Sequence, residues 1–328
     1  MRSLLLFKNL SLFFFETFII HFWDSVRYFI YSGVLRRRVD QASMQASLMM
    51  HAHTIEKGLS FKNIKPNFGE DNIRYIISKL NEYINKYAFD EDAAYVYGIL
   101  NEYFCYHKNL GVLNEELFKP FSLIIKGCNE NNCTAATKAI IPNVDFNLPW
   151  KDFKQFAMTR HSVRNFSPRP VDREKLKEAI EIAKYAPSVC NRQSWRVRIF
   201  DSKDRLDAAL ACQWGNRGFG DQAKAIILVT GQLNHFFTPK ERNQAYIDGG
   251  LFSMALVYAL HSFNLATCCL NLSLNLAREK QLRTKLKLKD SEVPIMMIAI
   301  GHYPENIKVA YSKRKALENI MINDEPYI

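Results

Sequence analysis

The chain has 328 residues and a formal net charge of +11, and 48% of its residues are hydrophobic. This length and composition exclude a disordered or fibrous protein and predict more than one folded unit. The charge is compatible with an anionic cofactor, an anionic membrane surface or nucleic acid. Because the basic residues are dispersed and no nucleic-acid recognition motif is present, we expect no nucleic-acid partner.

Seven cysteines are scattered along the chain without a CxxC pair. This odd number favours free thiols in a reducing compartment over a disulfide framework, and it predicts a cytoplasmic protein. Cys128 and Cys133 are close in sequence, but no second cysteine pair or histidine pair completes a zinc site. We therefore expect no metal centre.

Residues 1–38 begin with a segment rich in aromatic and aliphatic side chains. Its apolar run, 10–23, is shorter than the roughly 20 residues of a membrane span. Arginines at 36–38 follow it, where a signal peptide would have a small-residue cleavage site. Two interpretations remain open. A helix here packs its apolar face on the second domain or a partner subunit, which we favour, or it docks peripherally on an anionic membrane surface.

Three helices are expected from the apolar periodicity of residues 43–55, 72–87 and 93–106. Gly58 is placed to end the first helix as a left-handed cap, and Pro66 prevents the helix from resuming. This part of the chain is therefore predicted to be all-helical.

His51, His53 and Glu56 lie near the end of the first of these helices. Two histidines two positions apart face different sides of a helix, and no further ligand follows, so we favour a structural turn over a metal site. The alternative is that His53, Glu56 and Lys57 line the entrance to a pocket of the second domain.

Residues 127–150 contain Asn, Thr, Pro and Gly without clear periodicity, which is typical of a linker. We place the domain boundary near Pro149 and Trp150. The chain is thus divided into a helical region, 1–150, and a second domain, 151–328.

A basic, hydroxyl-bearing cluster opens the second domain with Arg160, His161, Ser162 and Arg164. Guanidinium groups, hydroxyls and free backbone N–H groups are the donors that bind phosphate, and this segment offers all three. An anionic group is therefore the expected ligand of this cluster.

A polar turn at 187–193 forms a second cluster, in which Asn191 and Gln193 carry side-chain amides. Such amides recognise a flat heteroaromatic ring with alternating donors and acceptors. Pro170 and Asp172 begin a helix of about fourteen residues between the clusters, which spans roughly 21 Å. The two clusters are thus separated poles that a long cofactor could bridge once the chain folds back.

Strands and helices alternate after Trp195. Strands are predicted at 195–200, 225–230, 266–272 and 295–300. A long helix at 244–263 is apolar on most sides, which indicates that it is buried.

These motifs resemble those of the FMN-dependent nitroreductase-like flavoproteins. The opening motif of that family, Arg-Arg/His-Ser-x-Arg-x-Phe, corresponds to residues 160–166. Its Ala-Pro-Ser-x-x-Asn-x-Gln-Pro-Trp motif corresponds to residues 186–195, with Ser194 in place of the usual Pro. Residues 301–304 and 312–318 resemble its Gly-Tyr-Pro turn and its Arg-Lys-Pro-Leu-Glu-Glu close.

The resemblance implies a three-layer α+β fold for residues 151–328, with a mixed, mostly antiparallel sheet flanked by helices. It also implies an oxidoreductase with bound FMN and with NADH or NADPH as electron donor. The acceptor would be a small molecule of nitro, quinone or enone type, or a biosynthetic intermediate, reduced by a ping-pong mechanism. A homodimer with FMN near the subunit interface is expected. The alternative is a catalytically weak flavin-binding scaffold whose N-terminal helices serve interaction with a protein or membrane surface.

Residue roles follow from the resemblance. Arg164 would stabilise the negative charge that reduction leaves at one edge of the flavin, and no side chain need act as a general base. Arg160, Ser162 and Arg314 would hold the phosphate. The expected cofactor-binding residues are Arg160, His161, Ser162, Arg164, Pro187, Ser188, Asn191, Gln193, Leu270, Asn271, Ser312 and Arg314.

Overall fold

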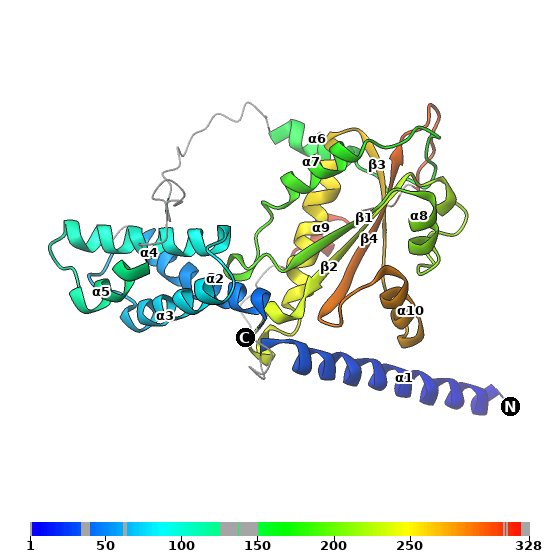
Figure 1. The fold of residues 1–328 in the computed structure, drawn as a ribbon. Helices are drawn as coiled ribbons and strands as arrows, with labels where there is room; N and C mark the ends of the chain where they lie inside the picture. The colour runs from blue at the N-terminus through cyan, green and yellow to red at the C-terminus, as the bar shows by residue number, and fades with distance from the viewer. Residues whose placement is uncertain are drawn as a thin grey trace.

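The computed structural model describes residues 2–33, 40–61, 64–124, 137, 150–310, 312 and 314–322. The predicted linker lies almost entirely outside these residues, as do Cys128, Cys133 and the arginines at 36–38. The five cysteines within the described ranges are free thiols, as expected. An N-terminal helical part and a part built on a β-sheet are visible in Figure 1.

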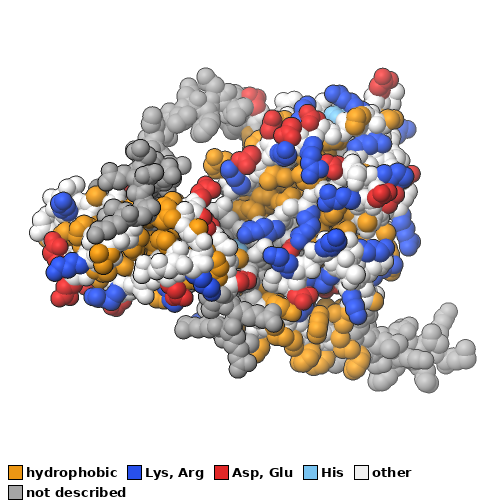
Figure 2. All heavy atoms as spheres, in the orientation of Figure 1, with side chains coloured by type: hydrophobic (Ala, Val, Ile, Leu, Met, Phe, Trp, Pro, Cys, Tyr) orange, Lys and Arg blue, Asp and Glu red, His pale blue; other side chains and the backbone are white. Residues whose placement is uncertain are grey.

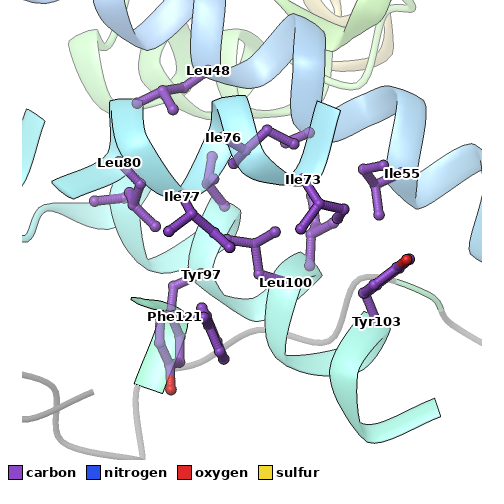
Figure 3. Close-up of a cluster of buried hydrophobic side chains, with 14 of the residues drawn as sticks. Leu48, Ile55, Ile73, Ile76, Ile77, Leu80, Tyr97, Leu100, Tyr103 and Phe121 are labelled. Carbon is purple, nitrogen blue, oxygen red and sulfur yellow. The ribbon is translucent and has the colours of Figure 1, made fainter. Parts of the chain in front are cut away.

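The helical part confirms the three predicted helices and adds one. Its helices are α2 (Gln41–Leu59), α3 (Glu70–Lys86), α4 (Glu91–Asn109) and α5 (Glu115–Ile124). The buried face of α3 consists of Ile73, Ile76, Ile77 and Leu80, at the spacing of an amphipathic helix. These side chains form one core with residues of α2, α4 and α5 (Figure 3). The helical region therefore has its own apolar core.

Gly58 does not end α2 as a left-handed cap, so this prediction was wrong. The helix continues to Leu59, and its last turn closes on Ser60 with right-handed backbone angles. Gly58 is required for packing instead, because a Cβ atom there would lie 2.1 Å from Cε2 of Phe68. The left-handed conformations occur further along the chain, at Asn67 and Gly69.

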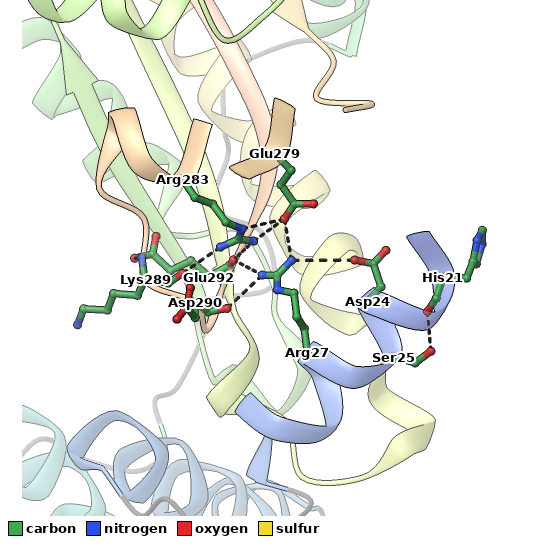
Figure 4. A network of polar contacts seen from close by, with 9 residues as sticks. All are labelled: His21, Asp24, Ser25, Arg27, Glu279, Arg283, Lys289, Asp290 and Glu292. Carbon is green, nitrogen blue, oxygen red and sulfur yellow. Dashed lines mark hydrogen bonds and ion pairs between the residues drawn. The ribbon is translucent and has the colours of Figure 1, made fainter. Parts of the chain in front are cut away.

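Helix α1 (Arg2–Tyr31) contacts the sheet domain through its C-terminal turns. Arg27 is buried there and donates to the carboxylate of Glu279 at 2.7 Å and to the carbonyl of Glu292 at 2.7 Å (Figure 4). Tyr28 packs beside it in a small apolar cluster. The favoured interpretation, packing on the second domain, is confirmed for this end of the helix. No helix among the described residues is long and apolar enough to cross a membrane.

The sheet has four strands, in the order β1-β2-β4-β3, and all neighbouring strands are antiparallel. The strands are β1 (Trp195–Phe200), β2 (Ala225–Gln232), β3 (Leu265–Leu270) and β4 (Glu292–His302). Every predicted strand is present. Among the described residues, an isolated parallel bridge joins Ser162 to Thr267 on the outer edge of β3.

Helices cover both faces of this sheet, as the three-layer prediction requires (Figure 1). They are α7 (Arg173–Ala183), α8 (Lys203–Leu210), α9 (Gln244–Ser262) and α10 (Leu276–Leu286). Helix α6 (Trp150–Thr159) packs on α9, where Phe156 contacts Tyr258 and His261. Alternate residues of β2 face opposite layers. Ile227 and Val229 pack with α7 and α9, whereas Ile226 and Leu228 pack with α8 and α10. The α+β fold is thus confirmed.

Candidate functional site

The phosphate-type cluster lies along the outer edge of β3. Ser162 bridges Thr267 in parallel, and the backbone N–H of Val163 donates to the carbonyl of Thr267 at 2.8 Å. The side chain of Val163 is fully buried and fixes the segment on the sheet. Because the two segments run in the same direction, Arg164 follows the bridge on the side of the C-terminal end of β3. The structure therefore brings the basic segment close to the strand that carries Leu270.

The two arginines of this segment, Arg160 and Arg164, can bind an anionic ligand. Within the described part of the chain, neither Arg160 nor Arg164 forms an ion pair. Burial raises the pKa of the Cys268 thiol, and both arginines oppose that rise. The pKa of His261 is lowered, first by burial and then by Arg160 and His161. Positive charge thus accumulates without a carboxylate partner, which suits an anionic group such as the FMN phosphate.

Leu270 is the last residue of β3, and Asn271 begins the loop that follows it. The carbonyl of Asn271 accepts a hydrogen bond from the side chain of Gln213 at 3.0 Å, and its side-chain oxygen accepts from the N–H of Ser273 at 3.2 Å. The loop is therefore held by Gln213, a residue that no motif in the sequence identifies.

The amide-bearing turn adopts an uncommon backbone. Cys190, Asn191 and Gln193 all have φ near +50°, a region that side-chain-bearing residues seldom occupy. The hydroxyl of Ser188 accepts the N–H of Gln193 at 3.0 Å. Such angles persist only where surrounding contacts impose them.

Buried polar residues supply those contacts, and sequence reasoning missed them. Arg192 is 4% exposed and donates to the carbonyl of His235 at 2.8 Å and to the carboxylate of Glu241. Asp248, near the start of α9, accepts the N–H of Val189. These contacts hold the turn against the domain, and within the turn the Gln193 amide donates to the carbonyl of Asn191 at 3.3 Å.

Asn191 and Gln193 line a cleft of about 740 Å³ between the turn and the helical region. The opposite wall comes from α4 and its N-terminal loop and includes Tyr95, whose hydroxyl donates to Glu56. The Asn191 side chain interacts with the same hydroxyl. Glu56 thus contacts a residue of the cleft wall, but none of His53, Glu56 and Lys57 lines the cleft itself, so the alternative that they line a pocket entrance stays a prediction. His53 is paired with Glu56 at 2.8 Å.

The two polar clusters occupy different surroundings in one chain. Arg160 lies with His261, Tyr303 and the thiols of β3, whereas Asn191 lies against the helical region. No hydrogen bond or shared cavity joins the clusters among the residues that the structure describes. A helix separates them along the chain, as the sequence predicted.

Arg314 and Ser312 are exposed, and the guanidinium of Arg314 donates to the carbonyl of Ser312. Their predicted convergence on the phosphate with Arg160 stays a prediction. Pro187 is exposed at the start of the turn. No group of three or more His, Cys, Asp or Glu residues suited to a metal occurs in the described ranges.

Residues 157–217, which include both clusters, match the model of the Nitroreductase family. This segment is similar to the Nitroreductase family. The chain is 32% identical over 120 residues to the CLA biosynthesis enone reductase of Lactiplantibacillus plantarum, and the matched segment covers 36% of this chain and 55% of that enzyme. The chain thus spans about half the length of this relative. It is 25% identical over 203 residues to the 4-nitrobenzoate reductase of Pseudomonas putida, covering 48% of this chain and 88% of that protein.

Solved structures of nitroreductase-like proteins also align with about half of the chain. An FMN-dependent nitroreductase from Clostridium difficile is 22% identical, with a TM-score of 0.44, and the match covers 52% of this chain and 98% of that one. A nitroreductase-like protein from Streptococcus mutans is 20% identical, with a TM-score of 0.47, over 54% of this chain and all of that chain.

Proposed function

We propose that the protein is an FMN-dependent NAD(P)H oxidoreductase that reduces a small organic acceptor of nitro, quinone or enone type. The observation that carries this proposal is the pair of arginines, Arg160 and Arg164, near the edge of β3 within the segment that matches the family, neither of which forms an ion pair with the residues that the structure describes. Relatives named as an enone reductase and a 4-nitrobenzoate reductase support an electron-poor acceptor.

Different residues of the basic segment would bind different parts of FMN. Arg160 and Ser162 would hold the phosphate, with Arg314 added from the C-terminal segment. Arg164 would face the edge of the ring on which negative charge develops. FMN supplies the hydride chemistry when bound, and the protein supplies position and charge. Donor and acceptor would then occupy the same face in turn, which is the ping-pong mechanism.

A second copy of the chain is the best candidate to bring the two clusters together. Helix α9 buries one apolar face in the domain, and it leaves a second apolar stripe exposed. Ile247, Leu251 and Met254 follow one another at helical spacing on that stripe and are 53%, 45% and 41% exposed. We propose that this stripe is the core of a homodimer interface, with FMN close to it.

Helix α1 carries another exposed apolar surface, visible along the lower edge of the molecule in Figure 2. Phe15, Phe18, Phe22 and Phe29 are exposed at spacings that place them on one side of the helix. We propose that a partner subunit covers this side. Binding of the purified protein to anionic lipid vesicles through α1 would instead support the peripheral membrane interpretation.

The absorption spectrum of the purified protein tests the proposal. We expect a flavin band near 450 nm that bleaches anaerobically with NADPH or NADH and returns when an enone or nitro compound is added. Mass spectrometry of the heat-released cofactor should identify FMN. A protein that binds FMN but is not reduced by either nicotinamide would support the scaffold alternative, and a protein that takes up no flavin would refute both.

The dimer is tested separately by light scattering. We expect twice the chain mass for the wild type and a monomer for Leu251→Glu. A wild-type monomer at micromolar concentration with FMN bound would contradict the interface.

A further inference from the structure

We infer that the helical region supplies a proton donor, Tyr95, to the acceptor that is reduced at the proposed flavin site. This inference rests on the proposed function and deepens it. The cleft between α4 and the amide-bearing turn has a volume of about 740 Å³, within the usual range for a small-molecule site. Both Tyr95 and the two amides line it. A ligand in this cleft would therefore touch both parts of the protein.

Tyr95 is the inner end of a chain of polar contacts that leads to the surface. Its hydroxyl donates to Oε1 of Glu56, and Oε2 of the same carboxylate lies 2.8 Å from Nδ1 of His53. The side chains of His53 and Glu56 are 30% and 22% exposed, so solvent reaches this end of the chain. On the cleft side, the Asn191 carboxamide interacts with the Tyr95 hydroxyl. The sequence HTIE, residues 53–56, thus forms part of a route from solvent to the cleft.

Reduction of a double bond conjugated to a carbonyl requires a hydride and a proton. FMN reduced by NAD(P)H would, when bound, supply the hydride with its electron pair for the C–H bond at the carbon β to the carbonyl. The Tyr95 O–H bond breaks as its proton forms the second C–H bond, at the α carbon. The phenolate then regains a proton from solvent through His53 and Glu56. All atoms and electrons are supplied by NAD(P)H, solvent and the acceptor.

The surroundings of Tyr95 keep the hydroxyl protonated until it is needed. Burial raises the pKa of Tyr95, and the hydrogen bond to Glu56 raises it further, while the interaction with Asn191 opposes the rise. The phenol is therefore neutral throughout the physiological pH range and carries a proton that it can donate. Of the acceptors in the proposed function, an enone is the one that takes up this proton at carbon.

Tyr95→Phe tests this role, with Tyr75→Phe as the matched control. Tyr75 lies in the same helical region, and its hydroxyl contacts Ser47 and not the cleft. Stopped-flow kinetics would follow two reoxidations of the NADPH-reduced protein, one by 2-cyclohexenone and one by ferricyanide, which takes electrons without a proton. Tyr95→Phe should slow the enone reaction about 100-fold or more, the usual effect of removing a positioned acid. The NADPH and ferricyanide steps should stay at wild-type rates in both variants.

The outcomes separate the two proposals. FMN binding and bleaching with equal enone rates in wild type and Tyr95→Phe would overturn the role of Tyr95 and leave the proposed function intact. Equal slowing of the enone and ferricyanide reactions would also overturn it, because the residue would then be structural. Failure of the wild type to bind flavin would overturn both proposals.

Discussion

Removal of the Arg160 guanidinium should weaken the binding of FMN while leaving the fold unchanged. Arg160 is half-buried beside β3 and has no carboxylate partner among the described residues, so its charge is available to a ligand. A hydrogen bond to a charged group contributes about 1.5–3 kcal/mol. Because about 1.4 kcal/mol corresponds to a factor of ten, a loss of roughly 2 kcal/mol raises the dissociation constant of FMN about 30-fold in Arg160→Ala.

The assay is titration of the flavin-free protein with FMN and with riboflavin, followed by quenching of flavin fluorescence. Riboflavin lacks the phosphate, so its dissociation constant should be the same in wild type and Arg160→Ala. Lys203→Ala is the control for net charge, because this side chain is 87% exposed on α8, and it should change FMN binding less than about twofold. An unchanged FMN constant in Arg160→Ala, or equal weakening for FMN and riboflavin, would refute the phosphate contact.

Four further predictions concern stability, measured as the free energy of unfolding in urea. Burial and two nearby arginines lower the pKa of His235 to about 3, so below pH 6.5 this histidine takes up a proton in the unfolded chain before it does so in the folded one. The free energy of unfolding of the wild type should therefore fall by about 3 kcal/mol between neutral pH and pH 4.5, and His235→Asn should largely abolish this fall. Gly58→Ala should lower the free energy of unfolding by about 1–3 kcal/mol, because its Cβ atom clashes with Phe68, and adding Phe68→Leu should restore part of this loss. If the effects of the two substitutions simply add in the double variant, the contact is contradicted. Arg27→Ala should cost about 3 kcal/mol and expose α1 to limited proteolysis, whereas an unchanged digestion pattern would show that the anchor lies elsewhere. Ser194→Ala removes a buried hydroxyl without a partner among the described residues and should be neutral or stabilising by up to about 1 kcal/mol, and a clear loss would reveal a missed partner.

The local pattern of apolar and polar residues was sufficient to predict most of the helices and strands. Asp172 caps α7 by accepting the N–H of Glu174, as its place before the apolar repeat predicted. The apolar runs at 225–230 and 295–300 became the two central strands, because only a strand covered on both faces tolerates such runs. The basic cluster and the polar turn were recognisable for the same reason, since each is contained within a few consecutive residues.

Tertiary structure alone decided how distant segments meet. Nothing local to Tyr95 indicates that it lies across a cleft from Asn191, because that meeting depends on how the helical region packs on the turn. Gly58 has the sequence context of a helix cap, but the packing of Phe68 makes it an interior residue. Arg27 lies within an aromatic segment, and its partners on α10 and β4 come from the other end of the chain. Periodicity reports which face of an element is buried, and the choice of partner follows from packing that no local pattern encodes.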